Sequence, residues 1–258
     1  MTDQAMGALS APQFTIGKVI GTSFAVLTRN IVPFAIIAAI LSIPYIIVER
    51  VYAVDPTQLQ AMIRQGQLPP GFGSYIALYL IVTVVTSSLT SAALVYGTFQ
   101  DLRGQKATIG DSLTRGFSAL VPVLLAAIAY TILYMIGFIL LIIPSIIVVV
   151  ALWVYVPAII VERMGVGDAF RRSRELTKGS RWTIFGLLIV IAIGAWLVSW
   201  VVGLVFGFAL GSSGVEWAGV VARILISAFG AVSVAVGYYY LRADKEGVAI
   251  GDIATVFD

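Results

Sequence analysis

The chain contains neither cysteine nor histidine. It therefore forms no disulfide and offers no thiolate, and it lacks both the commonest metal ligand and the usual proton carrier near neutral pH. Charged residues are also scarce, at 11% of the chain, whereas hydrophobic residues reach 60%. Because a soluble domain of this length needs far more polar surface, the composition predicts an integral membrane protein.

Motifs for catalysis are missing as well. The sequence has no paired-carboxylate motif, nucleophile elbow, phosphate-binding loop or cluster of metal ligands. We therefore expect a protein that is not an enzyme and needs no cofactor. Its basic residues are interleaved with acidic ones and belong to no recognition module, so we expect no nucleic-acid partner.

Long apolar runs alternate with short polar segments along the whole chain. This pattern predicts one all-α polytopic membrane domain, residues 1–258, with six transmembrane helices at about 31–48, 75–99, 120–141, 144–161, 182–208 and 217–240. Residues 120–161 contain no charged residue and are too long for one helix across a hydrocarbon core of about 30 Å. We therefore expect a turn at Pro144-Ser145.

Three shorter segments have amphipathic helical periodicity, at about 14–28, 109–119 and 166–178. Each begins with a similar Ile-Gly or Val-Gly pattern, and Ser23, Gly116 and Ser173 fall in register. The pattern predicts three repeated units, each a cytoplasmic interfacial helix followed by a helical hairpin. The alternative is that this pattern only suits the start of a surface helix, where an aspartate favours the helix dipole.

Basic residues are distributed very unevenly between the two sides of the predicted bundle. Thirteen of the sixteen lie on the side that holds both termini, only Arg50 and Arg64 lie on the other, and Arg223 falls inside the last span. The positive-inside rule then predicts a multi-pass protein of the bacterial cytoplasmic (inner) membrane with both termini in the cytoplasm.

Six basic residues are concentrated between Arg163 and Arg181. This stretch is either a solvated connecting helix whose charge sets the topology, or a surface that contacts anionic phospholipid headgroups or a membrane-protein partner, including a second copy. The candidate contact residues are Arg171, Arg172, Arg174, Lys178 and Arg181.

Polar groups within the spans define a second candidate site. Arg223 shares a helical face with Ser227, and the span at 75–99 carries a stripe of hydroxyl residues that includes Thr86 and Thr90. The hydroxyls favour either back-bonding and close packing or a polar transport path. Arg223 either reaches the outer interface, with Glu49 or Glu216 as an ion-pair partner, or contacts a ligand.

Two stretches resemble a known family. Val161-Glu162, Gly165 to Leu176 and Gly179 to Gly186 match one signature, and Tyr239-Tyr240-Leu241-Arg242 with Lys245-Glu246-Gly247 matches the tyrosine-rich ending. They resemble the six-span membrane domain found alone in many bacteria and fused to some glycerophosphoryl diester phosphodiesterases. The residues that carry this structural signature are Glu162, Gly167, Asp168, Arg242 and Glu246.

The resemblance implies a non-catalytic membrane domain, because the sequence has no counterpart of the phosphodiesterase barrel. It departs from the family at Tyr240, where an aspartate is usual, and at Arg174, where an aromatic residue is usual.

Two functions follow as the leading hypotheses, and an intramembrane enzyme is a third alternative. The first is a membrane scaffold or lipid-associated module with basic cytoplasmic helices. The second is a small transporter or channel-like protein with a polar cavity near Arg223 and the hydroxyl stripe. A continuous polar cavity that reaches the stripe argues against a scaffold, whereas a dry core argues against a transporter.

Overall fold

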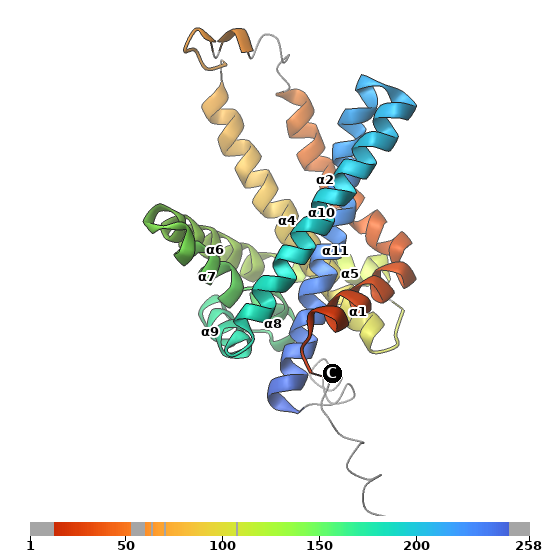
Figure 1. Ribbon diagram of the computed structural model, residues 1–258, viewed down its shortest axis with the longest axis vertical. Coiled ribbons are helices and arrows are strands. Elements are labelled where there is room, and N and C mark those ends of the chain that lie inside the picture. Colours follow the sequence, from red (N-terminus) through yellow and green to blue (C-terminus); the bar gives the residue numbers. More distant parts are fainter. Residues whose placement is uncertain (1–12, 53–59, 63, 70, 107, 248–258) are drawn as a thin grey trace, which may run out of the picture.

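The computed structural model describes residues 13–52, 60–62, 64–69, 71–106 and 108–247, apart from the side chains of residues 212, 213 and 216. Regular structure in these ranges is entirely helical (Figure 1). The helices are α1 (Ile16–Arg29), α2 (Ile31–Val51), α4 (Phe72–Leu102), α5 (Ile109–Ser118), α6 (Leu120–Leu140), α7 (Ile142–Ala151), α8 (Tyr155–Glu162), α9 (Val166–Thr177), α10 (Arg181–Leu210) and α11 (Ser212–Glu246).

Within the described ranges, six helical segments are long and apolar enough to cross a membrane. They are α2, α4, α6, α7 with α8, α10 and most of α11. This confirms the predicted class, a helical polytopic membrane protein. The short helices α1, α5 and α9 stand directly before α2, α6 and α10. Their placement at a membrane interface, and the three-hairpin repeat, stay predictions.

Local sequence explains where α5 begins. Thr108 caps α5, since its Oγ1 accepts a hydrogen bond from the Asp111 backbone N–H at 3.1 Å and donates to the Asp111 carboxylate. Ser23, Gly116 and Ser173, the small residues in register, are all buried. Each short helix therefore turns a small residue towards the bundle, where little space is available.

The outer surface of the bundle is apolar. Of the 30 residues of α10, only Ile184 and Leu187 are buried, while Trp182 and Phe208 are 85% and 89% exposed. Contiguous apolar surface of this extent is unfavourable in water and neutral in hydrocarbon. The exposed side chains of α10 are therefore suited to face lipid.

Helix α11 runs through the middle of the molecule and packs against α10, α4, α1 and α2 (Figure 1). Its second half supplies much of the core, including fully buried Val232, Val236, Tyr238 and Leu241. We call the end of the bundle where α1 begins and α11 ends the terminal end. The opposite end, where α2 ends and α10 meets α11, is the loop end.

The turn predicted at Pro144-Ser145 is wrong. The chain instead leaves α6 at Leu141, which is extended with φ −178° and ψ 157°, and Pro144 lies in the first turn of α7. A proline is favourable there because the first helical turn needs no N–H donor. Gly137 of α6 allows the close return, since a Cβ there would lie 2.9 Å from the Ser145 nitrogen.

The predicted span at 144–161 is also interrupted. It consists of α7 and α8, separated by the non-helical residues Leu152 to Val154. Trp153, within the break, packs against α11 at Gly237, where a Cβ would lie only 2.2 Å from the indole Cη2. The glycine thus gives the indole ring the space it occupies.

Replacing Gly237 with alanine should destabilise the protein, because the added Cβ collides with the Trp153 ring. We expect a loss of about 2 kcal/mol, the usual size of an overpacking defect, seen as a lower Tm of the detergent-solubilised protein. Gly219→Ala is the control on the same helix, because a Cβ there meets nothing within 4 Å. An unchanged Tm in Gly237→Ala would contradict the contact.

Candidate functional site

A cavity of about 440 Å³ lies between α2, α4, the α7–α8 break and α11. This volume is within the usual range for small-molecule sites, about 300–1,000 Å³. The cavity brings together all four residues of the predicted intramembrane polar site, Arg223, Ser227, Thr86 and Thr90. Its lining also includes the neighbouring hydroxyl residues of α4, which are Thr83, Ser87 and Ser91.

The α4 hydroxyls form the back-bonds considered from the sequence, and they also line the cavity. Thr86 donates its proton to the Val82 carbonyl at 2.7 Å, and Thr90 donates to the Thr86 carbonyl at 2.8 Å. Each proton is thus used within α4, while the oxygens line the cavity and still accept hydrogen bonds. Thr83 Oγ1 is buried without a hydrogen-bond partner among the described residues. The wall therefore suits a ligand that carries hydroxyl or amine donors.

Arg223 supplies the cationic group of the cavity. Its guanidinium carbon lies 3.9 Å from the centroid of the Tyr45 ring, a close cation–π contact. The Tyr45 hydroxyl donates to Glu49 at 3.1 Å, so Glu49 is linked to the arginine only through the tyrosine. The side chain of Glu216, the other predicted partner, lies outside the described residues. No described carboxylate forms an ion pair with Arg223.

The lining of the cavity is more exposed towards the loop end. Arg223 and Ser87 are exposed at that end, whereas Trp153 and Val156 are buried at the other. Arg223 and Val234, both in the lining, are eleven residues apart. At 1.5 Å per residue the cavity is about 16 Å deep, roughly half of a hydrocarbon core of about 30 Å.

The floor of the cavity is the α7–α8 break, and α9 satisfies its backbone. The Ser173 hydroxyl donates to the Ala151 carbonyl at 3.0 Å and accepts from the Val154 N–H at 3.3 Å. Thr177 Oγ1 lies 3.2 Å from the same carbonyl. Non-helical backbone at membrane depth is tolerated where protein groups replace the missing hydrogen bonds. Helix α9 thereby holds the floor in place.

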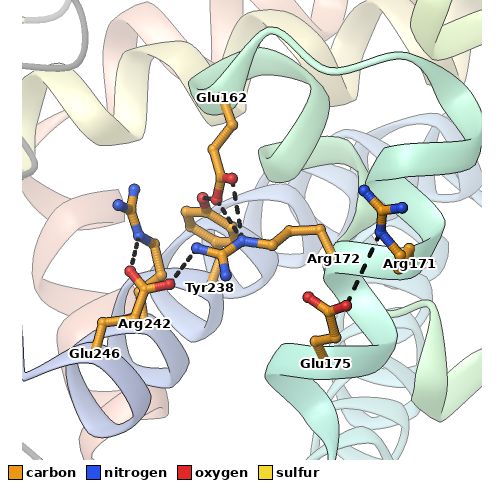
Figure 2. A network of polar contacts seen from close by, with 7 residues as sticks. All are labelled: Glu162, Arg171, Arg172, Glu175, Tyr238, Arg242 and Glu246. Carbon is orange, nitrogen blue, oxygen red and sulfur yellow. Dashed lines mark hydrogen bonds and ion pairs between the residues drawn. The ribbon is translucent and has the colours of Figure 1, made fainter.

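Below the floor, at the terminal end, lies a network of charged side chains (Figure 2). The Arg172 Nε donates to both carboxylate oxygens of Glu162, at 2.9 and 3.0 Å. The same arginine also pairs with Glu246, which in turn accepts from Arg242 Nε at 2.8 Å. The Tyr238 hydroxyl donates to Glu162. Three signature residues, Glu162, Arg242 and Glu246, are thus brought together with Arg172.

The network is electrically balanced and largely screened from solvent. Side-chain exposure is 20% for Arg172 and 12% for Glu162, and two arginines face two glutamates. Burial lowers the pKa of Arg172, but its hydrogen bonds to Glu162 and Glu246 raise it by more, so the pKa lies above its ordinary value. Arg172 therefore stays charged and bound to its carboxylates.

Of the five predicted contact residues in and after α9, Arg172 faces the bundle and the other four are exposed. Arg172 is held in the network and faces the bundle. Arg171 is exposed but pairs with Asp168 at 2.9 Å and lies 4.0 Å from Glu175, and Arg174 donates to the Phe170 carbonyl at 3.3 Å. Lys178 and Arg181 are exposed, as is the signature residue Gly167.

Several residues of the site carry no clear signal in the sequence. Trp153 closes the cavity floor only because Gly237, far along the chain, makes room for it. Tyr45 matters through its stacking on Arg223 of another helix. Two tyrosines near the end of α11 make different contacts. Tyr240 shares a hydrogen bond with Thr22 of α1 at 2.9 Å, whereas Tyr238 donates to Glu162. The one usable hint was Glu162 itself, a lone carboxylate at the end of an uncharged run.

No family model, curated protein or solved structure matches this chain. The resemblance to the six-span membrane domain stays a prediction.

Arg172→Gln should destabilise the protein by about 2 kcal/mol, because it breaks charge-assisted hydrogen bonds to two partly buried carboxylates. The expected observation is a lower Tm in detergent. Arg171→Gln is the matched control on the next position of α9, where the ion pairs are exposed and contribute less than about 1 kcal/mol. Equal Tm changes in the two variants would show that the network does not stabilise the fold.

Proposed function

We propose that the protein is a small transporter of hydroxylated organic anions in the bacterial cytoplasmic membrane, acting without covalent catalysis. The observation that carries this proposal is Arg223, a cation without a described carboxylate partner, on the wall of a cavity lined by the α4 hydroxyls. The scaffold alternative has less support, because Arg171 and Arg172 of its basic surface are engaged by acidic side chains.

The lining supports the substrate class. A guanidinium attracts an anionic group such as a carboxylate, and it does so more strongly in a cavity than in bulk water. The hydroxyl oxygens of α4 accept hydrogen bonds from substrate hydroxyls. Rings of Tyr130 and Tyr155 offer apolar surface to the carbon chain. A sugar acid combines all three features.

The placement of the cavity supports transport rather than storage. Discontinuous helices and a binding site near the bilayer midplane are common in secondary transporters. If both termini lie in the cytoplasm, as the charge distribution predicts, the exposed end of the cavity faces the outside. The charged network then lies on the cytoplasmic side of the cavity floor. Release to the cytoplasm then requires the Trp153 contact and the network to separate.

Within the described residues, no group of three acidic or other metal-binding side chains could hold a metal ion. Glu49 accepts a hydrogen bond from Tyr45, the residue whose ring contacts Arg223. These residues support the binding and movement of an intact solute.

Arg223→Gln should reduce uptake of radiolabelled gluconate into proteoliposomes by about tenfold or more, since a charge-assisted hydrogen bond contributes about 1.5–3 kcal/mol. Arg64→Gln, an exposed arginine between α2 and α4, is the control and should transport normally. An unchanged Tm in Arg223→Gln separates loss of binding from misfolding. Wild-type uptake no greater than in protein-free liposomes, or normal uptake by Arg223→Gln, contradicts the proposal.

Thr86→Val should weaken gluconate uptake by about fivefold through a higher KM, because one hydrogen-bond acceptor worth about 1 kcal/mol is lost from the wall. Thr98→Val is the matched control. Thr98 lies on the same helix and back-bonds in the same way, to Leu94 at 2.8 Å, but is fully buried away from the cavity. Equal KM values for the two variants would exclude the α4 hydroxyls from substrate binding.

A further inference from the structure

A second cavity, of about 430 Å³, lies at the terminal end between α4, α5, the start of α6 and the end of α8. It is separate from the first cavity, which is lined by the α4 hydroxyls and which we call the α4 hydroxyl cavity. None of the hypotheses drawn from the sequence involves this second cavity. Its polar lining includes Arg115, Ser118, Arg163 and Tyr96, and its apolar lining includes Pro122 and Ile160.

Two arginines face this cavity without an acidic partner. The residues that line it include no aspartate or glutamate, and no described carboxylate pairs with Arg115 or Arg163. Arg115 lies over the Tyr96 ring, 5.9 Å from its centroid. Nearby arginines differ, since Arg29 pairs with Asp101 at 2.6 Å and Arg172 pairs with Glu162. The lining therefore carries two positive charges and no negative one.

Arg163 is held in a backbone conformation that rarely suits an arginine. It ends α8 with φ 51° and ψ 39°, and it is the one non-glycine residue with positive φ among the described residues. Glycine is the usual residue at such a helix end because it lacks a Cβ. A glycine substitution at Arg163 therefore removes the charge and keeps the backbone conformation, so a change in ligand affinity reports the loss of the side chain.

The cavity lies at the boundary of the predicted membrane. Helix α6 begins at Leu120 and the α7–α8 span ends at Glu162, and both are ends of candidate spans. At this level phospholipid headgroups lie beside the protein, with their acyl chains directed inwards. Pro122, Ile160 and Met164 supply an apolar wall next to the two guanidinium groups. Arginine binds phosphate oxygens through its planar set of N–H donors.

We propose that this cavity binds the phosphate group of an anionic phospholipid, held between Arg115 and Arg163 with the start of the lipid chains against Pro122 and Ile160. The proposal differs from a diffuse basic surface on α9, because it assigns the contact to two residues of one cavity. It is also independent of transport, since the α4 hydroxyl cavity shares no residue with it.

The test uses the delipidated full-length protein in detergent, titrated with phosphatidylglycerol, phosphatidylcholine or inorganic phosphate. Binding is followed by native mass spectrometry and by the shift in Tm. We expect phosphatidylglycerol to bind preferentially, and the Arg115→Gln, Arg163→Gly double variant to bind it about 30-fold more weakly. Arg163→Gly alone should keep or raise the Tm of the lipid-free protein and still lose affinity.

The control is an Arg174→Gln, Lys178→Gln double variant, which removes the same charge from exposed positions outside the cavity. It should retain phosphatidylglycerol. Equal losses in both double variants, or none in either, would overturn the assigned site. If inorganic phosphate binding depends on Arg115 and Arg163 but phosphatidylglycerol binding does not, the lipid assignment is wrong. The cavity is then a site for free phosphate. If the double variant does not fold, lipid binding is measured with Arg115→Gln alone.

Discussion

Backbone N–H and C=O groups inside a bilayer have no water to bond, so the interruption between α7 and α8 depends on the protein for its hydrogen bonds. Ser173 and Thr177 of α9 provide them at Ala151 and Val154. This requirement brings a highly charged helix directly against the centre of an apolar bundle. Arg172, the residue before Ser173, is consequently carried to Glu162, and the charged network forms beside the break.

The charged network and the cavity lined by the α4 hydroxyls treat charge in opposite ways. At the terminal end, Arg172 and Arg242 are matched by Glu162 and Glu246, so the network holds segments together without attracting further ions. In the α4 hydroxyl cavity, Arg223 stacks on an aromatic ring and keeps its charge available. The first arrangement suits a closed contact between helices, and the second suits an anionic ligand.

Helix α11 connects these arrangements. It carries Arg223 in the cavity wall, Gly237 against Trp153 at the floor, and Tyr238, Arg242 and Glu246 in the network. Because a helix is stiff along its axis, a tilt of α11 alters the cavity and the network together. A single element thus links the cavity wall with the charged network.

The sequence by itself determined the class of protein, because the hydrocarbon core demands long uncharged runs and these are visible without any tertiary information. It also singled out Arg223, Thr86 and Thr90, since polar groups within apolar runs are conspicuous. It failed at Pro144-Ser145, where a proline typical of turns instead occupies the first turn of α7. A local pattern does not distinguish these two positions.

Only the tertiary structure decided what the polar residues do. Arg172 and Arg171 are adjacent and chemically identical, yet packing of Ser173 against the helix break turns one into the bundle and leaves the other exposed. Trp153 meets Gly237, and Arg115 and Arg163 line the same cavity, although each pair is far apart in the sequence. Hydrophobic pattern depends on neighbours along the chain, whereas a binding site depends on which helices pack together.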